Sequence, residues 1–193
     1  MNDETVIHHG ITIRIIQDEN PESPRNWDNL GTMFCAHRRH NLGDKQFESW
    51  AGLDEALRQT GKMAVILPLY LFDHSGITIR CSSDEFRAAD GAGWDWGQVG
   101  YVFVTKEKAR KEWGKLTAAT LKKIKKCLIA EVDTYDKYLT GDVYGYVVDP
   151  EGEKESCWGF YGGPEGSYEY CLGEAKAVAE QIAAKRPSVY MSV

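Results

Sequence analysis

The chain has 193 residues, a formal net charge of −6, and 42% hydrophobic and 27% charged residues. With six tryptophans and ten tyrosines, this composition excludes a disordered chain. The length fits one domain or two small ones and suffices for a substantial core. The five cysteines are widely spaced and form no Cys-x-x-Cys pair. Neither a zinc ribbon nor a disulfide framework is therefore indicated, and reduced thiols in a cytoplasm are expected.

The N-terminal ten residues, MNDETVIHHG, lack the basic and apolar regions of a secretory signal. The longest apolar stretch, residues 63–72, contains Pro68 and is ten residues long, whereas a membrane span needs about 20. We therefore expect neither a secretory leader nor a membrane segment.

Charge is distributed unevenly along the chain. The segment from Lys106 to Lys126 holds nine basic and two acidic residues, and the remainder is acidic. One interpretation is an acidic surface that meets a basic partner, such as a nucleic-acid-binding enzyme. The basic segment could instead contact nucleic acid directly, and the simplest alternative is that the acidity serves solubility alone.

The first half of the chain predicts strands, two loops and one helix. Alternating apolar residues indicate strands, and Phe47, Trp50, Leu53 and Leu57 have helical spacing. In chain order the predicted elements are strand 11–16, a proline-bearing loop 20–29, strand 31–36, loop 37–44, helix 46–60, a central strand 63–72 and its hairpin partner 77–81.

The second half begins with a polar, glycine-rich segment, 82–97. It then predicts strand 98–104, helix 105–113, a long helix 117–139 with four lysines away from its apolar stripe, a hairpin of strands 142–149 and 156–161, and helix 172–185. Strands occur in adjacent groups, which favours an α+β fold over a doubly wound one. We expect one α+β domain over residues 1–193, with a mainly antiparallel sheet flanked by about four helices.

Residues 27–44 are expected to serve mainly the packing of the fold, with a few residues free to contact a ligand. Trp27 is expected to pack onto the sheet as a buried aromatic and to anchor the proline-bearing loop. Met33 and Cys35 should point into the core, and Phe34 into the opposite face. His37 and Arg39 follow the strand and are the residues most free to touch a ligand.

Polar side chains cluster where predicted strands end, which is where binding sites often form. The candidate ligand- or partner-binding residues are His37, Arg38, Arg39, Asp44, Asp73, His74, Asp95 and Asp142. Within this set, Asp73 and His74 directly follow the most apolar strand.

An enzyme is the competing interpretation. Asp73, His74, Asp95 and Cys157 would then be catalytic, and His37, His74 and Asp73 would hold a divalent metal. No metalloprotease, nucleophile-elbow or phosphate-loop motif occurs in the sequence. We therefore commit to no catalytic residue, cofactor or metal, and expect a protein that is not an enzyme.

Five stretches carry a resemblance: NWDNLGTMFCAHRRHNLGD, YLFDHSGITI, WDWGQVGYVFVTKEKARKEWG, DTYDKYLTGDVYGYVV and ESCWGFYGG. Together they resemble a family of uncharacterised proteins of bacteriophages, prophages and plasmids. In that family an aromatic usually stands where this chain has His40, and a small residue where it has Trp96. The difference at His40 argues against a metal site that needs His40 as a ligand.

The resemblance implies a setting rather than an activity: an accessory protein of a mobile element, acting in the cytoplasm of a bacterial host. We expect it to inhibit a nucleic-acid-targeting defence system, in the manner of anti-CRISPR or anti-restriction proteins, by binding a host nuclease or another defence protein. The alternative is a small metal-assisted hydrolase that uses the Asp and His cluster.

Overall fold

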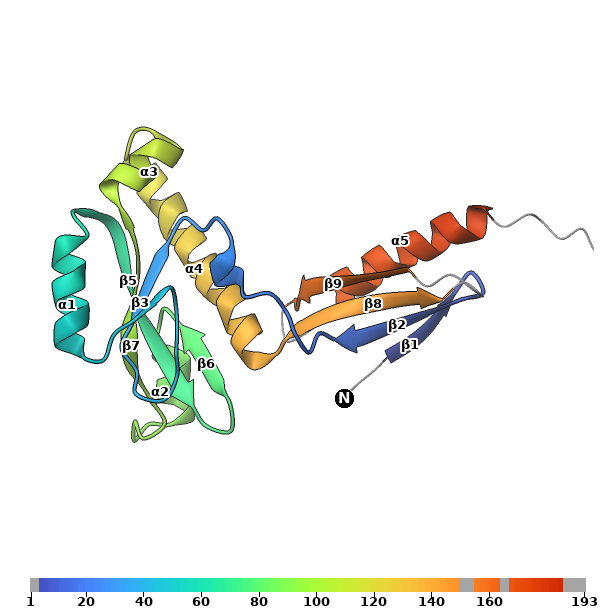
Figure 1. Cartoon of the computed structure of the whole chain (residues 1–193), viewed down its shortest axis with the longest axis horizontal. Helices are drawn as coiled ribbons and strands as arrows, with labels where there is room; N and C mark the ends of the chain where they lie inside the picture. Colours follow the sequence, from blue (N-terminus) through green and yellow to red (C-terminus); the bar gives the residue numbers. More distant parts are fainter. Residues whose placement is uncertain (1–3, 150–154, 164–166, 186–193) are drawn as a thin grey trace, which may run out of the picture. The chain divides into compact units, whose positions relative to one another are not determined.

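The computed structural model describes residues 4–149, 155–163 and 167–185 (Figure 1). The chain divides into two compact units, a central unit of residues 23–140 and a terminal unit of residues 1–22 and 141–193. Each unit has its own sheet and its own buried cluster. The α+β prediction is confirmed. We expected one domain over residues 1–193, and the structure divides into two compact units.

The terminal unit is a four-stranded antiparallel sheet with one helix against it. Its strands are β1 (Glu4–His8), β2 (Ile11–Gln17), β8 (Val143–Asp149) and β9 (Glu155–Tyr161), and they lie in the order β1-β2-β8-β9. Alternate residues of β2, namely Ile11, Ile13 and Ile15, are fully buried. They pack with Ala175 and Ala179 of α5 (Glu169–Lys185).

The central unit is a five-stranded mixed sheet between helices. Its strands lie in the order β4-β3-β7-β5-β6, and only the β3–β4 pair is parallel. They are β3 (Thr32–Cys35), β4 (Lys45–Gln46), β5 (Met63–Asp73), β6 (Ile77–Arg80) and β7 (Trp96–Thr105). The helices are the short 3-10 helix η1 (Pro24–Asn26), α1 (Trp50–Gln59), α2 (Asp84–Ala89), α3 (Lys106–Trp113) and α4 (Ala118–Thr140). Figure 1 shows α1 on one side of this sheet and α4 on the other.

The long helix α4 covers one face of the central sheet. Its apolar stripe of Ile124, Leu128 and Val132 is fully buried, whereas the four lysines of its first half are exposed, as predicted. Asp136, also on α4, is buried and accepts a hydrogen bond of 2.7 Å from the backbone N–H of Ile79. Gly141 follows the helix with φ of +73°, a conformation that glycine adopts without strain.

Met33 and Cys35 are fully buried, as the alternation predicts. Phe34 points to the opposite face, where its ring packs against Phe47 and Phe103. The prediction for Trp27 is wrong, because 46% of this residue is exposed.

The anchor of the proline-bearing loop is Arg25, whose side chain is only 6% exposed. Its guanidinium donates to both oxygens of Asp44, at 2.8 and 2.7 Å, and to the backbone oxygen of Gly31 at 2.8 Å. Glu131 of α4 lies 3.5 Å away and accepts the backbone N–H groups of Leu30 and Gly31. Burial opposes the charge of Arg25, but Asp44 and Glu131 raise its pKa above the usual value.

Four short elements were not predicted: β1, η1, β4 and α2. Of these, η1 lies in the expected loop 20–29, and β4 lies where the loop 37–44 was expected to give way to a helix. β1 is an edge strand with mostly exposed residues, so its sequence lacks the apolar alternation by which strands are recognised. The six-residue helix α2 lies in the polar segment 82–97, where a single buried residue, Phe86, anchors it. Within the described ranges, no helix has the length and apolar composition needed to cross a membrane.

Candidate functional site

The topology of the central sheet brings three chain segments to one edge. β3 and β5 both run antiparallel to β7, so the ends of β3 and β5 meet the start of β7. The loop after β3 carries His37 to His40, β5 ends at Asp73, and Asp95 directly precedes β7. Residues that are distant in the sequence thus become neighbours.

Asp73 is the centre of the first contact group. Its Oδ2 accepts from Arg39 Nη2 at 2.6 Å and lies 2.9 Å from His40 Nε2. The hydrogen bond with His40, together with the charge of Arg39, lowers the pKa of Asp73. Asp73 is therefore an ionised carboxylate at neutral pH.

His37 organises the loop on which these partners stand. Its Nδ1 accepts the backbone N–H of His40 at 3.2 Å, and its ring stacks on that of His40 with centroids 5.0 Å apart. Partial burial and the neighbouring His40 lower the pKa of His37. This histidine is consequently neutral at pH 7.

The second contact group joins His74 and Asp95. His74 Nδ1 lies 2.8 Å from Asp95 Oδ2, and the backbone N–H of Asp73 donates to the backbone oxygen of Asp95 at 2.7 Å. Asp90 fixes this loop by accepting the N–H groups of Trp94 and Asp95 at 2.6 and 3.0 Å. The indole of Trp94 projects from the loop with 87% of the residue exposed.

Two hollows lie side by side at this edge. One, of about 260 Å³, is lined by His37, Arg39, Asp73, Trp94 and Asp95 among others. The other, of about 560 Å³, is lined by His37, Arg38, Arg39 and Trp50 among others. Because His37 and Arg39 line both, the hollows form one concave surface. We call it the Arg39 face and define it by His37, Arg38, Arg39, Trp50, Asp73, Trp94 and Asp95.

The structure thus brings together six of the predicted site residues. Five of them, His37, Arg38, Arg39, Asp73 and Asp95, belong to the Arg39 face, and His74 joins it through Asp95. Sequence reasoning missed Trp50 and Trp94, and it did not commit to His40. The signals were a histidine three residues after His37 and two tryptophans flanking Asp95.

Asp44 is held by partners within the central unit. Both of its carboxylate oxygens are bonded to Arg25, and Oδ2 also accepts the backbone N–H of Met33 at 2.7 Å. Asp142 and Cys157 belong to the terminal unit, where Asp142 directly precedes β8 and Cys157 is exposed on β9. None of these three residues is therefore part of the Arg39 face as the central unit builds it.

The predicted metal trio of His37, His74 and Asp73 does not share a ligand position. Asp73 pairs with Arg39 and His40, while His74 turns to Asp95. Among the described residues, the one group of three potential ligand atoms within 4.8 Å of one another lies in the terminal unit. The guanidinium of Arg39 beside Asp73 also opposes the binding of another cation there.

The predicted catalytic set is likewise not assembled within one unit. Cys157 lies in the terminal unit, and neither cysteine nor serine lines the 260 Å³ hollow. Cys35 lies two residues before His37 in the sequence. It is fully buried, and burial raises its pKa to about 12. A thiol of that kind is a packing group rather than a nucleophile.

Comparisons with known proteins give no match, whether against protein-family models, the curated proteins or the solved structures.

Proposed function

We propose that the chain is a binding protein and that the Arg39 face is its contact surface for a protein partner. The observation that carries this proposal is the combination of an 87% exposed Trp94, a 40% exposed Trp50 and an arginine whose side chain is 71% exposed, all around one concave surface. Tryptophan and arginine are the residues most enriched among binding hot spots.

The fixed geometry of this face favours binding over turnover. Trp94 stands on a loop fixed by Asp90, and Arg39 is oriented by its 2.6 Å contact with Asp73. Side chains held before contact lose less conformational entropy on binding. The charged groups at its centre are already paired, so their positions are set before a partner arrives.

The partner class follows from the sequence. The net charge of −6 favours a basic partner, and the resemblance to phage and plasmid proteins suggests a host defence system. We infer that the chain inhibits a nucleic-acid-targeting defence system of the anti-CRISPR or anti-restriction type, in the bacterial cytoplasm, by binding its nuclease or another of its proteins. Association should weaken as salt rises, and a flat salt dependence would remove the electrostatic part of this inference.

The test is a pull-down from host lysate with matched variants. The face variant Arg39→Ala/Trp94→Ala is compared with Arg58→Ala/Trp113→Ala, which removes another exposed arginine and tryptophan of the same unit. Arg58 matches Arg39 closely, because its side chain is 74% exposed and that of Arg39 is 71% exposed. A defence protein retained by the wild type and the control, but lost by the face variant, supports the proposal. Equal retention by both variants contradicts it.

One observation favours a hydrolase as the second candidate. His40 with Asp73 and His74 with Asp95 are two imidazole–carboxylate pairs beside one hollow, an arrangement in which a carboxylate can orient a general base. A hydrolase would show turnover of phosphodiesters or esters, with or without Mn²⁺, that His74→Gln abolishes while partner capture persists. Absence of turnover in the wild-type chain excludes this candidate for those substrates.

Direct contact with nucleic acid through the basic segment is a separate part of the proposal. Lys122, Lys123, Lys125 and Lys126 are exposed on α4, and lysines that meet phosphates make binding steeply salt-dependent. If the segment contributes, Lys122→Ser/Lys126→Ser should weaken duplex DNA binding and reduce its dependence on salt. Unchanged binding would assign these lysines to solubility.

A further inference from the structure

Two consecutive histidines lie at the tip of the first hairpin. β1 ends at His8 and β2 begins at Ile11, and His8 and Ile11 are paired. The two residues between the strands, His9 and Gly10, have φ of +50° and +72°. Positive φ at both central residues is the signature of a two-residue type I′ hairpin turn.

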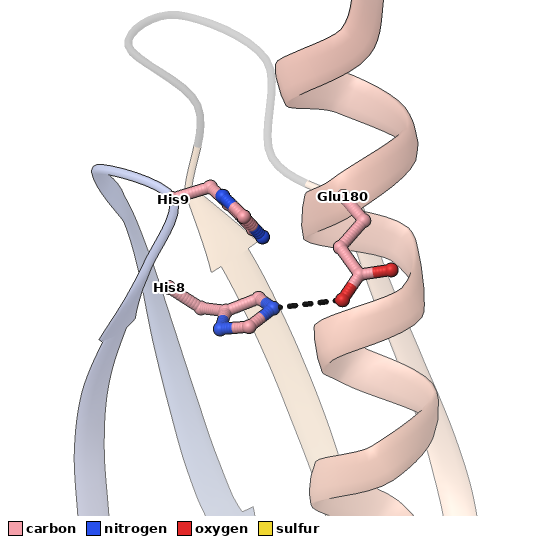
Figure 2. Close-up of side chains that lie close together, drawn as sticks. All are labelled: His8, His9 and Glu180. Atoms are coloured by element: carbon pink, nitrogen blue, oxygen red, sulfur yellow. Dashed lines mark hydrogen bonds and ion pairs between the residues drawn. The ribbon is translucent and has the colours of Figure 1, made fainter.

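This turn places both imidazoles on the same side of the hairpin. Neighbouring residues within a strand point to opposite faces, but the left-handed conformation of His9 redirects its side chain. The two rings lie 4.4 Å apart between centroids, at 71° to each other. Figure 2 shows both rings reaching toward helix α5.

Helix α5 supplies a carboxylate at this point. Glu180 Oε1 lies 3.0 Å from His8 Nε2 (Figure 2). One potential ligand atom from each of His8, His9 and Glu180 lies within 4.8 Å of the other two. The side chains are accessible, with exposures of 26% for His8 and 58% for Glu180.

We propose that His8, His9 and Glu180 form a binding site for a divalent transition-metal ion, with zinc as the best fit. Two imidazoles and one carboxylate suit zinc rather than Mg²⁺ or Ca²⁺, which prefer several oxygen ligands. Tetrahedral zinc holds its ligand atoms roughly 3.3 Å apart. The His8–Glu180 pair is near that spacing, and small side-chain rotations complete it.

The site has three protein ligands, so water or a ligand atom from another molecule completes the tetrahedron. Its ligands come from the hairpin and from α5, which lie far apart in the sequence. A bound ion therefore links the helix to the edge of the sheet and should stabilise the terminal unit, because metal that binds the folded state shifts the equilibrium toward it. The zinc site is independent of the function proposed for the Arg39 face.

The test is titration of the full chain with zinc chloride by calorimetry, alongside cobalt(II) absorption spectra. His9→Asn is the sharpest variant, since asparagine tolerates positive φ and preserves the turn. Glu180→Gln and His8→Gln remove the other two ligands. Glu174→Gln, on the same helix, and His74→Gln, in the central unit, are the matched controls. Cys157→Ser tests whether the exposed thiol of the terminal unit is the true ligand.

We expect one zinc ion per chain, a tetrahedral cobalt spectrum, and a higher melting temperature with zinc. Each ligand variant should weaken binding by at least about tenfold, since even loss of a residue that only supports a ligand has effects of this size. The controls and Cys157→Ser should bind as the wild type does. Absence of stoichiometric binding, wild-type affinity in His9→Asn, or loss of binding in Cys157→Ser would overturn the proposal.

Discussion

Arg25 illustrates how one buried charge can determine the course of a loop. Trp27 is 46% exposed, so it does not anchor the proline-bearing segment in the core as a buried aromatic would. Instead, Arg25 connects Asp44, Gly31 and Glu131, and so ties the loop to β3 and α4. The sequence contains no local pattern for this network, because its members are up to 106 residues apart.

Replacement of Arg25 by alanine should therefore be strongly destabilising. Breaking a buried ion pair by removing one partner costs about 3–5 kcal/mol, here because Asp44 and Glu131 lose their cation. Urea unfolding measures the change. The control Arg58→Ala, whose partner Glu55 is 3.4 Å away on an exposed helix face, should stay within about 0.5 kcal/mol of the wild type. Similar losses for both variants would contradict the role given to Arg25.

The lowered pKa of Asp73 predicts how the stability of the fold depends on pH. Its pKa in the folded chain lies below the ordinary 3.8, mainly because of the hydrogen bond with His40. The folded state therefore holds fewer protons than the unfolded state at acidic pH, and stability is lost as pH falls through the folded pKa. The contribution is fully present above about pH 4.

Asp73→Asn removes this titration, so its free energy of unfolding should fall less steeply than that of the wild type below about pH 4. Urea unfolding at several pH values gives the comparison, and Asp28→Asn, at an exposed loop position, is the control. Parallel pH profiles for the wild type and Asp73→Asn would show that the pair with His40 does not form.

Among the elements, sequence patterns predicted a helix or strand correctly where its buried residues follow a regular period. Strand 63–72 and helix 117–139 are present as β5 (Met63–Asp73) and α4 (Ala118–Thr140), because an apolar run and a long apolar stripe leave few alternatives. β1 was missed since pairing with β2 specifies it, rather than its own composition. The convergence of Asp73 with Arg39 required the strand order, which no local pattern encodes.

The close approach of β3 and β7 gives a prediction for one glycine. A Cβ at Gly100 would overlap the backbone oxygen of Phe34 and lie 2.9 Å from Cα of Cys35. Gly97, in the same strand, has open space at that position. Gly100→Ala should cost about 1–3 kcal/mol or more, because the backbone of β3 must move.

Gly97→Ala should change stability by less than about 1 kcal/mol. Thermal or urea unfolding of the two variants under identical conditions makes the comparison, and each serves as the other's reference. If Gly100→Ala were as stable as Gly97→Ala, the register of β3 against β7 would be wrong.

In the whole molecule, the described residues form two buried clusters, one in each compact unit, whereas we expected one domain. The central unit is a continuous segment, and its buried cluster contains residues 33–135 alone. The terminal unit is made from both ends of the chain. No linker or change in composition marks the boundary between the units, so the sequence alone predicted a single domain.

The central unit should therefore fold without the chain ends. A fragment of residues 23–140 is expected to unfold in one cooperative transition and to retain the partner binding of the full chain, since the Arg39 face lies entirely within it. Circular dichroism and urea unfolding test the first expectation, and the pull-down tests the second. A fragment that is unfolded under native conditions would show that the two units depend on each other.

Phage plating tests whether the Arg39 face, as we propose, inhibits a host defence by binding one of its proteins. A phage targeted by a single CRISPR or restriction system is plated on hosts that produce equal amounts of the wild-type chain, Arg39→Ala/Trp94→Ala or Arg58→Ala/Trp113→Ala. Across a panel of such systems, we predict one for which the wild type and the Arg58/Trp113 control restore plating and the Arg39/Trp94 variant does not. Equal plating with all three proteins for every system would contradict the proposed role of the Arg39 face.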